Sequence, residues 1–145
     1  MKYMLDTDIC IYIRKQKPER VIERLRRTEL DDLCLSAITL CELEYGVSKS
    51  EAPEINRVAL VTFLAPFQVV AFDAKAAREY GQLRTELERA GTPIGGMDML
   101  IAAHALSLRC ALVTNNEAEF ARVPRLRVKN WAKPEDGSRQ EKNQP

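Results

Sequence analysis

Short apolar segments alternate with longer amphipathic ones along this chain, and no other feature limits its possible folds as strongly. The apolar segments predict strands at residues 3–5, 33–35, 69–72 and 111–114, followed by an edge strand at 126–129. The amphipathic segments predict helices at 9–14, 19–27, 53–64, 97–108 and 117–121, a long helix between Asp73 and Gly91, and one that starts at Ser36 or Thr39. This alternation indicates an α/β domain with a central, mostly parallel sheet flanked by helices.

Length and composition indicate one ordinary globular domain. The chain has 145 residues and a formal net charge of +1, so it carries no overall positive field that would point to nucleic acid. We place the domain at residues 1–132 and predict a disordered tail at the polar, aperiodic residues 133–145. The longest apolar runs are too short to span a bilayer and the N-terminus lacks a signal-peptide layout, so we expect a cytoplasmic protein with no membrane association.

Cysteine and histidine usage excludes several kinds of site. The four cysteines show no metal-binding spacing and lie among apolar neighbours, which favours reduced thiols in the core; they are Cys10, Cys34, Cys41 and Cys110. The single histidine, His104, excludes a ribonuclease with two catalytic histidines and a multi-histidine zinc site. On a helix, His104 and Asp98 would point in different directions, so we expect His104 to be a packed helix residue.

Four carboxylates occupy positions where an isolated charge would be costly. Asp6 follows the first predicted strand, Glu42 lies inside an apolar helical pattern, Asp98 starts an alanine-rich helix, and Glu119 follows the strand at 111–114. Desolvating a carboxylate is expensive unless a partner neutralises it, and no lysine or arginine lies within two positions of Glu42 or Asp98. Mg²⁺ or Mn²⁺, which take oxygen ligands, would be suitable partners. Since ligands collect at the carboxyl ends of parallel strands, we predict that the four acids converge there.

Each acid also has an ordinary structural explanation. Asp6 could be an exposed loop acid or a helix cap, and we predict Thr7 or Asp8 as the N-cap of the first helix. Asp98 could complement the helix dipole, a role worth about 0.3–1 kcal/mol. Glu42 and Glu119 could simply face water. The metal-site hypothesis therefore depends on the set of four and not on any single member.

Four motifs in order along the chain resemble those of PIN domains, and most closely those of the VapC toxins of bacterial toxin–antitoxin pairs. The motifs are Met4–Ile13, Glu42–Val47, Met97–Ala105 and Leu112–Phe120. The resemblance runs from Met1 to about Trp131. Four ordered motifs make it specific, whereas the Asp6-Thr7-Asp8 piece alone would not.

The resemblance implies a PIN-like three-layer fold and an endoribonuclease toxin that depends on Mg²⁺ or Mn²⁺. The family's metal-binding and catalytic positions correspond to Asp6, Glu42, Asp98 and Glu119, and its supporting polar positions to Thr7 and Asn116. The family further implies a VapB-type protein antitoxin, a homodimeric toxin, and the anticodon stem-loop of initiator tRNA as substrate. Two positions depart from it, because Asp8 stands where close relatives commonly carry Asn, and Glu119 where many PIN domains carry Asp.

RNA contacts would fall to local arginines, because the net charge is close to zero. The candidates are Arg20, Arg24, Arg27, Arg78, Arg84, Arg122, Arg125 and Arg127.

Two other functions fit part of the sequence. Asp6-Thr7-Asp8 after one strand and Thr114-Asn115-Asn116 after another suit an aspartyl-phosphate phosphatase of the haloacid-dehalogenase type. That reading does not explain Glu42 or Asp98. A catalytically inactive, RNA-binding PIN module is the other alternative, and we would expect it to have lost one of the four acids.

Overall fold

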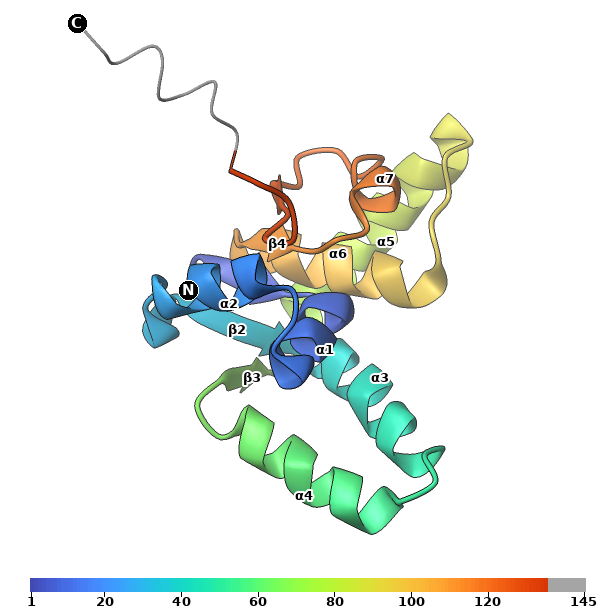
Figure 1. The fold of residues 1–145 in the computed structure, drawn as a ribbon. Coiled ribbons are helices and arrows are strands. Elements are labelled where there is room, and N and C mark those ends of the chain that lie inside the picture. Colours follow the sequence, from blue (N-terminus) through green and yellow to red (C-terminus); the bar gives the residue numbers. More distant parts are fainter. Residues whose placement is uncertain (136–145) are drawn as a thin grey trace, which may run out of the picture.

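One parallel sheet forms the centre of the molecule (Figure 1). The computed structural model describes residues 1–135, and within that range five strands pair in the order β3-β2-β1-β4-β5. Their bounds are Tyr3–Leu5 (β1), Leu33–Ser36 (β2), Gln68–Val70 (β3), Ala111–Val113 (β4) and Val128–Lys129 (β5). The four pairings between them are all parallel. The predicted α/β class and its parallel sheet are confirmed.

The strand order changes direction between β1 and β4, the two strands at the middle of the sheet. From β1 the chain moves outward through β2 and β3, and it then returns to place β4 and β5 on the other side. Such a switch point opens a crevice at the carboxyl ends of the two strands, where open α/β sheets bind ligands. The residues that directly follow β1 and β4, beginning with Asp6 and Thr114, lie at that crevice.

Helices cover both faces of the sheet and complete three layers. Because side chains alternate along a strand, Met4 joins a core with α5 (Ala74–Ala90), α6 (Gly96–Leu108) and α7 (Glu117–Phe120). Leu5 joins a second core with α1 (Thr7–Lys15), α2 (Glu19–Arg26), α3 (Ala37–Ser48) and α4 (Pro53–Leu64). A 3₁₀ turn, Leu30–Asp32, leads into β2. In Figure 1, α3 and α4 form a hairpin that projects downward from the rest of the domain.

Asp6 caps α1, which corrects the prediction of Thr7 or Asp8. The Asp6 Oδ1 accepts the backbone N–H of Thr7 at 2.8 Å. The chain is still extended at Asp6 (ψ 163°) as it leaves β1, and this is the backbone conformation of an N-cap. The helix therefore begins two residues earlier than expected. The predicted caps Ser36 and Asp73 are confirmed for α3 and α5.

Other differences from the prediction follow from how the strands pair and from which face α3 turns to the core. Cys41 is exposed, unlike the other three cysteines, because α3 turns Leu43 and Val47 into the core. β3 lies at Gln68–Val70, not at 69–72, since its pairing ends with Ser36, the last residue of β2. β5 retains only the last two residues of 126–129, which pair with Leu112 and Val113.

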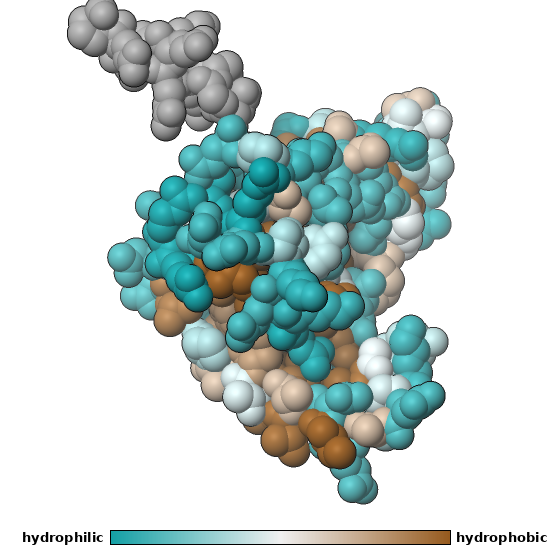
Figure 2. Space-filling view, in the orientation of Figure 1, coloured by the Kyte–Doolittle hydropathy of each residue, from teal (hydrophilic) through white to brown (hydrophobic). Residues whose placement is uncertain are grey.

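The surface is mostly hydrophilic in Figure 2, with hydrophobic atoms in the middle of the view and over α4 at its bottom. Ile55, Val58 and Val61 of that helix are 64–73% exposed. No helix within residues 1–135 is both long and apolar enough to cross a membrane. Of the predicted tail, Lys133 pairs with Glu117 and Glu135 with Arg24 and Arg27, whereas residues 136–145 lie outside the described range.

Candidate active site

Asp6 lies where β1 meets the crevice of the sheet. Its backbone N–H donates to the Val113 carbonyl oxygen at 2.9 Å, which ties it to β4. While Oδ1 caps α1, Oδ2 accepts the Thr114 hydroxyl at 2.7 Å. Asp6 is 5% exposed, and this burial, together with the nearby Asp8 carboxylate, raises its pKa to about 6. Asp6 is therefore a buried acid as well as a helix cap.

Glu42 reaches the site from α3, which begins at the carboxyl end of β2, next to β1. The Thr7 hydroxyl donates to Glu42 Oε1 at 2.6 Å and so joins α1 to α3. The charge of Glu42 contributes to the raised pKa values of Asp6 and Asp98. Glu42 thus lies close enough to both acids to act on them electrostatically, and it does not stand alone on a solvated helix face.

Asp98 and Glu119 meet beside the N-terminal turn of α6. Glu119 Oε1 accepts the Gly95 backbone N–H at 2.6 Å, and its Oε2 accepts the Asn116 side-chain amide at 2.8 Å. A Cβ added at Gly95 would lie 3.5 Å from Glu119 Oε1 and 3.7 Å from Asp98 Oδ2. The two carboxylates therefore flank the same glycine, and a Cβ there would touch both at ordinary van der Waals distance.

The pKa values of this pair move apart. Burial, followed by the hydrogen bond and charge of Glu119, raises the pKa of Asp98 to about 8. The Gly95 N–H and then the Asp98 side chain lower the pKa of Glu119. Two adjacent carboxylates cannot both ionise without a counter-charge. Without a counter-charge, the pair therefore favours a protonated Asp98 beside an ionised Glu119.

Thr114 is a contact of the site that the sequence reasoning did not propose as a support. It is fully buried, donates to Asp6, and accepts the Asn116 backbone N–H at 3.0 Å. Asn116, which was proposed, donates to Glu119. Thr114 directly follows the buried strand β4, just as Asp6 follows β1, and this parallel position is the signal that could have identified it.

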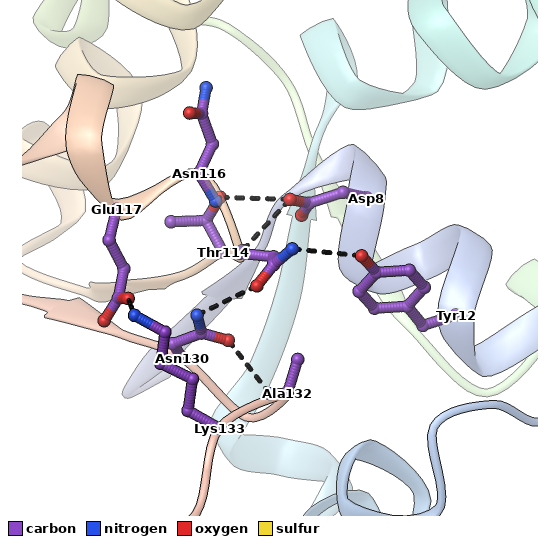
Figure 3. Close-up of polar contacts among 9 residues, drawn as sticks. Asp8, Tyr12, Thr114, Asn116, Glu117, Asn130, Ala132 and Lys133 are labelled. Carbon is purple, nitrogen blue, oxygen red and sulfur yellow. Dashed lines mark hydrogen bonds and ion pairs between the residues drawn. The ribbon is translucent and has the colours of Figure 1, made fainter.

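A polar loop after β4 is fastened to α1 and to the C-terminal segment (Figure 3). The Asn115 backbone N–H donates to Asp8 Oδ2 at 3.0 Å, and its side-chain amide donates to the Tyr12 hydroxyl at 3.1 Å. Asn130 in turn donates to Asn115 Oδ1 at 3.0 Å. Burial raises the pKa of Asp8. The loop that presents Thr114 and Asn116 to the acids is thus held on two sides.

The four predicted acids lie close enough to act on one another electrostatically. Glu42 accepts the hydroxyl of Thr7, the residue next to Asp6, and Asp98 lies beside Glu119. The charges of Asp6 and Glu42 both act on Asp98. Within residues 1–135, no lysine or arginine forms a salt bridge with any of the four. A site of carboxylate oxygens that no salt bridge neutralises suits a hard divalent cation.

In the part of the chain that the structure describes, no three acidic, histidine or cysteine side chains are grouped as they would be around a bound ion. Hydroxyl, amide and backbone groups donate instead to Asp6, to Glu119 and to one oxygen of Glu42. The carboxylate oxygens still fit Mg²⁺ or Mn²⁺ as ligands. A bound cation would neutralise their negative charge and would favour the ionised form of Asp98.

Other candidate residues have structural roles. His104 is buried, its Nδ1 lies 2.7 Å from the Ser36 hydroxyl, and its ring is edge-on to Phe72. Burial lowers its pKa, and the prediction of a packed helix residue is confirmed. Of the arginines proposed for RNA contact, several form ion pairs with glutamates; these are Arg24, Arg27, Arg84 and Arg125.

Comparison with known proteins agrees with these motifs. A family model described as PIN domain matches residues 3–126. The tRNA(fMet)-specific endonuclease VapC of Salmonella typhimurium is 45% identical over 131 residues, which cover 90% of this chain and 98% of that protein. Ribonuclease VapC2 of Rickettsia felis is 45% identical over 134 residues, covering 92% of this chain and 100% of that protein.

Solved structures give the same likeness in three dimensions. VapBC2 from Rickettsia felis, bound to a DNA fragment from its promoter, superposes with a TM-score of 0.84 at 44% identity, covering 90% of this chain and 99% of that one. DNA-bound VapBC from Salmonella typhimurium superposes with a TM-score of 0.86 at 45% identity, covering 90% and 98%.

Proposed function

This chain belongs to the PIN-domain family, and from that premise we propose that it is the ribonuclease toxin of a VapBC-type pair. We further propose that Asp6, Glu42, Asp98 and Glu119 are its metal-binding and catalytic residues. The observation that carries this proposal is that these four carboxylates lie near the switch point of the sheet, close enough for Asp98 to feel the charges of the other three, with no salt bridge to a lysine or arginine in residues 1–135.

When bound, Mg²⁺ or Mn²⁺ would supply an activated water and would polarise the phosphodiester of RNA. The protein's own residues orient the carboxylates beforehand. Asp6 is fixed by the Thr7 N–H and the Thr114 hydroxyl, and Glu119 by Gly95 and Asn116. Such outer contacts keep ligand oxygens aimed at one place. Burial and the neighbouring Glu119 raise the pKa of Asp98, so a bound cation would favour its ionised form.

The two alternatives explain less of the molecule. A phosphatase would use Asp6 as a nucleophile, but it would leave Glu42 and Asp98 without a role. An inactive RNA-binding module would have no use for these four acids, among which burial and then Glu119 raise the pKa of Asp98 to about 8. Neither alternative has support from the relatives, which are ribonucleases by name.

Substrate and partners follow from the same relatives. Because one is a tRNA(fMet)-specific endonuclease, we propose the anticodon stem-loop of initiator tRNA as substrate. Similar structures are VapBC complexes, which supports a VapB-type antitoxin. The exposed aliphatic side chains of α4 suit a protein partner, either that antitoxin or a second toxin chain in a homodimer. We place the nuclease domain at residues 1–132 and the polar tail at 133–145, in a cytoplasmic protein.

Expression of the chain alone in bacteria tests this function. Wild type should arrest growth and produce fragments of initiator tRNA cut in the anticodon stem-loop, whereas soluble Asp98→Asn protein should do neither. Co-expression of the cognate antitoxin should restore growth. Arrest by Asp98→Asn, or arrest with intact initiator tRNA, would contradict the site or the substrate respectively.

A further inference from the structure

A groove leads away from the acids along α1, between that helix and the α3–α4 hairpin. Its volume is about 770 Å³. Thr7 and Glu42 line one end, which makes the groove continuous with the candidate active site, and Arg14 and Lys15 line the other. Between the two ends, Gly46 and Phe63 are among the residues that form its walls.

The length of the groove suits a short stretch of a chain molecule. Thr7 and Lys15 are the first and last residues of α1, and eight steps of helical rise separate them by about 12 Å. Stacked nucleotides advance about 3.4 Å each along a strand, and splayed nucleotides advance further. The groove therefore has room for two or three nucleotides beyond the acids.

The chemistry of the groove changes along its length. Neither Arg14 nor Lys15 forms a salt bridge within residues 1–135, so both cations are free to meet an anion. The middle is largely apolar and includes the partly buried ring of Phe63. Bases that have left a duplex stack on aromatic and apolar side chains, and their phosphates pair with nearby cations. Single-stranded RNA is the ligand that would place bases against the apolar middle and a phosphate at the cationic end.

We propose that the groove binds the unpaired nucleotides on one side of the cut, with their bases against the apolar walls and a phosphate at Arg14 and Lys15. This inference rests on the proposed function, because it places the phosphodiester to be cut at the four acids. It assigns substrate binding to Arg14, Lys15 and Phe63, which neither net charge nor motif matching singled out. It also predicts that a fully paired RNA is a poor ligand.

Gly46 offers a way to fill the groove without disturbing the acids. A Cβ added there would have no heavy atom within 4 Å, so Gly46→Leu can be accommodated while its side chain occupies the groove. Gly81 of α5 has equally open surroundings and is remote from the groove, so Gly81→Leu is the matched control. Thermal melts of both variants check that each is folded.

Binding is measured by fluorescence anisotropy with a six-nucleotide unpaired oligoribonucleotide, in an Asp98→Asn background that prevents cutting. Gly46→Leu should weaken binding by about tenfold or more, and Gly81→Leu should not change it. Replacing both Arg14 and Lys15 with Gln should weaken binding and reduce the slope of log affinity against log salt by roughly 0.7 per lost phosphate contact. This second variant tests the groove even if Gly46→Leu does not fold.

Unchanged binding by folded Gly46→Leu, or no RNA binding at all, overturns the proposal. Cutting is assayed separately with Mn²⁺ in otherwise wild-type protein. If the wild type cuts RNA and Gly46→Leu cuts equally well, the groove assignment fails and the proposed function stands. If RNA binding depends on Gly46 but nothing is cut, the groove assignment stands and the proposed function fails. A Gly46→Leu toxin that cuts normally but escapes its antitoxin assigns the groove to a protein segment and also overturns the proposal.

Discussion

Asp6 and Asp98 differ in how much structure depends on them. Asp6 caps α1 with one oxygen and accepts the Thr114 hydroxyl with the other, so its replacement would disturb a helix start as well as the site. Asp98 contacts its neighbour Glu119 and caps no helix. Loss of activity in an Asp98 variant is therefore easier to interpret than the same loss in an Asp6 variant.

The raised pKa of Asp98 makes stability depend on pH in the metal-free protein. Its pKa is about 8 in the fold and 3.8 ordinarily, so between these values the folded state holds a proton that the unfolded chain releases. The contribution of this proton to the free energy of unfolding is complete below pH 3.8 and is lost as the pH rises through about 8. We expect the wild-type melting temperature to fall between pH 5 and 8, and that of Asp98→Asn to fall less.

Bound metal should restore the stability that the metal-free protein loses as the pH rises. Saturating Mg²⁺ or Mn²⁺ should stabilise the wild type by about 2.7 kcal/mol at a hundredfold excess over the dissociation constant, and Asp98→Asn by much less. Melts of both proteins at pH 8, with EDTA or Mn²⁺, check the two expectations together. A wild-type melt that Mn²⁺ leaves unchanged would mean that these acids form no cation site.

Two neighbouring glutamates on α7 should behave differently. Glu119 contacts Gly95, Asn116 and Asp98, whereas Glu117 pairs with Lys133 at the surface. Glu119→Gln should lower the rate of RNA cleavage at least about tenfold, a loss of roughly 1.4 kcal/mol of transition-state stabilisation. Glu117→Gln is the matched control and should be nearly silent. The opposite order, measured in the same assay, would mean that Glu119 has been assigned the wrong role.

At the scale of helices and strands, the sequence predicted the order of elements well, because apolar runs and capping residues are local signals. Pro53–Leu64 and Tyr3–Leu5 match their predicted bounds. Contacts between residues that are far apart in the sequence were harder to predict. The hydrogen bond from Thr114 to Asp6 joins residues 108 apart, and the exposure of Cys41 depends on how α3 is rotated against the sheet. Such features follow from packing, which the local pattern does not contain.

The cap of α5 separates stability from activity. Asp73 Oδ1 accepts the Ala76 N–H at 3.0 Å, and α5 carries none of the proposed site residues. Asp73→Ala should therefore lower the free energy of unfolding by about 1 kcal/mol and leave the rate of RNA cleavage unchanged. Urea denaturation and the cleavage assay at a temperature well below the transition check this. An activity loss as large as that of Asp98→Asn would mean that activity depends on general stability and not on the acids.

At the scale of the whole molecule, the fold itself creates the site. Parallel strands β1 and β4 end side by side at the switch point, and helices from both faces of the sheet add Glu42 and Asp98. The predicted acids could be found from the sequence because they follow apolar strands or interrupt apolar helices. The groove beside them could not, because its walls come from α1, α3 and α4, whose relative positions only the tertiary structure shows.

Cleavage of RNA by the purified protein is the most direct test of the central claim. Initiator tRNA is incubated with wild type or Asp98→Asn, in Mg²⁺, in Mn²⁺ and in EDTA, and the products are resolved by length. The four-acid site predicts cutting by the wild type with either metal, no cutting in EDTA, recovery when Mn²⁺ is added back, and no cutting by folded Asp98→Asn at any metal concentration. Cutting that persists in EDTA, or that Asp98→Asn performs at the wild-type rate, would contradict it.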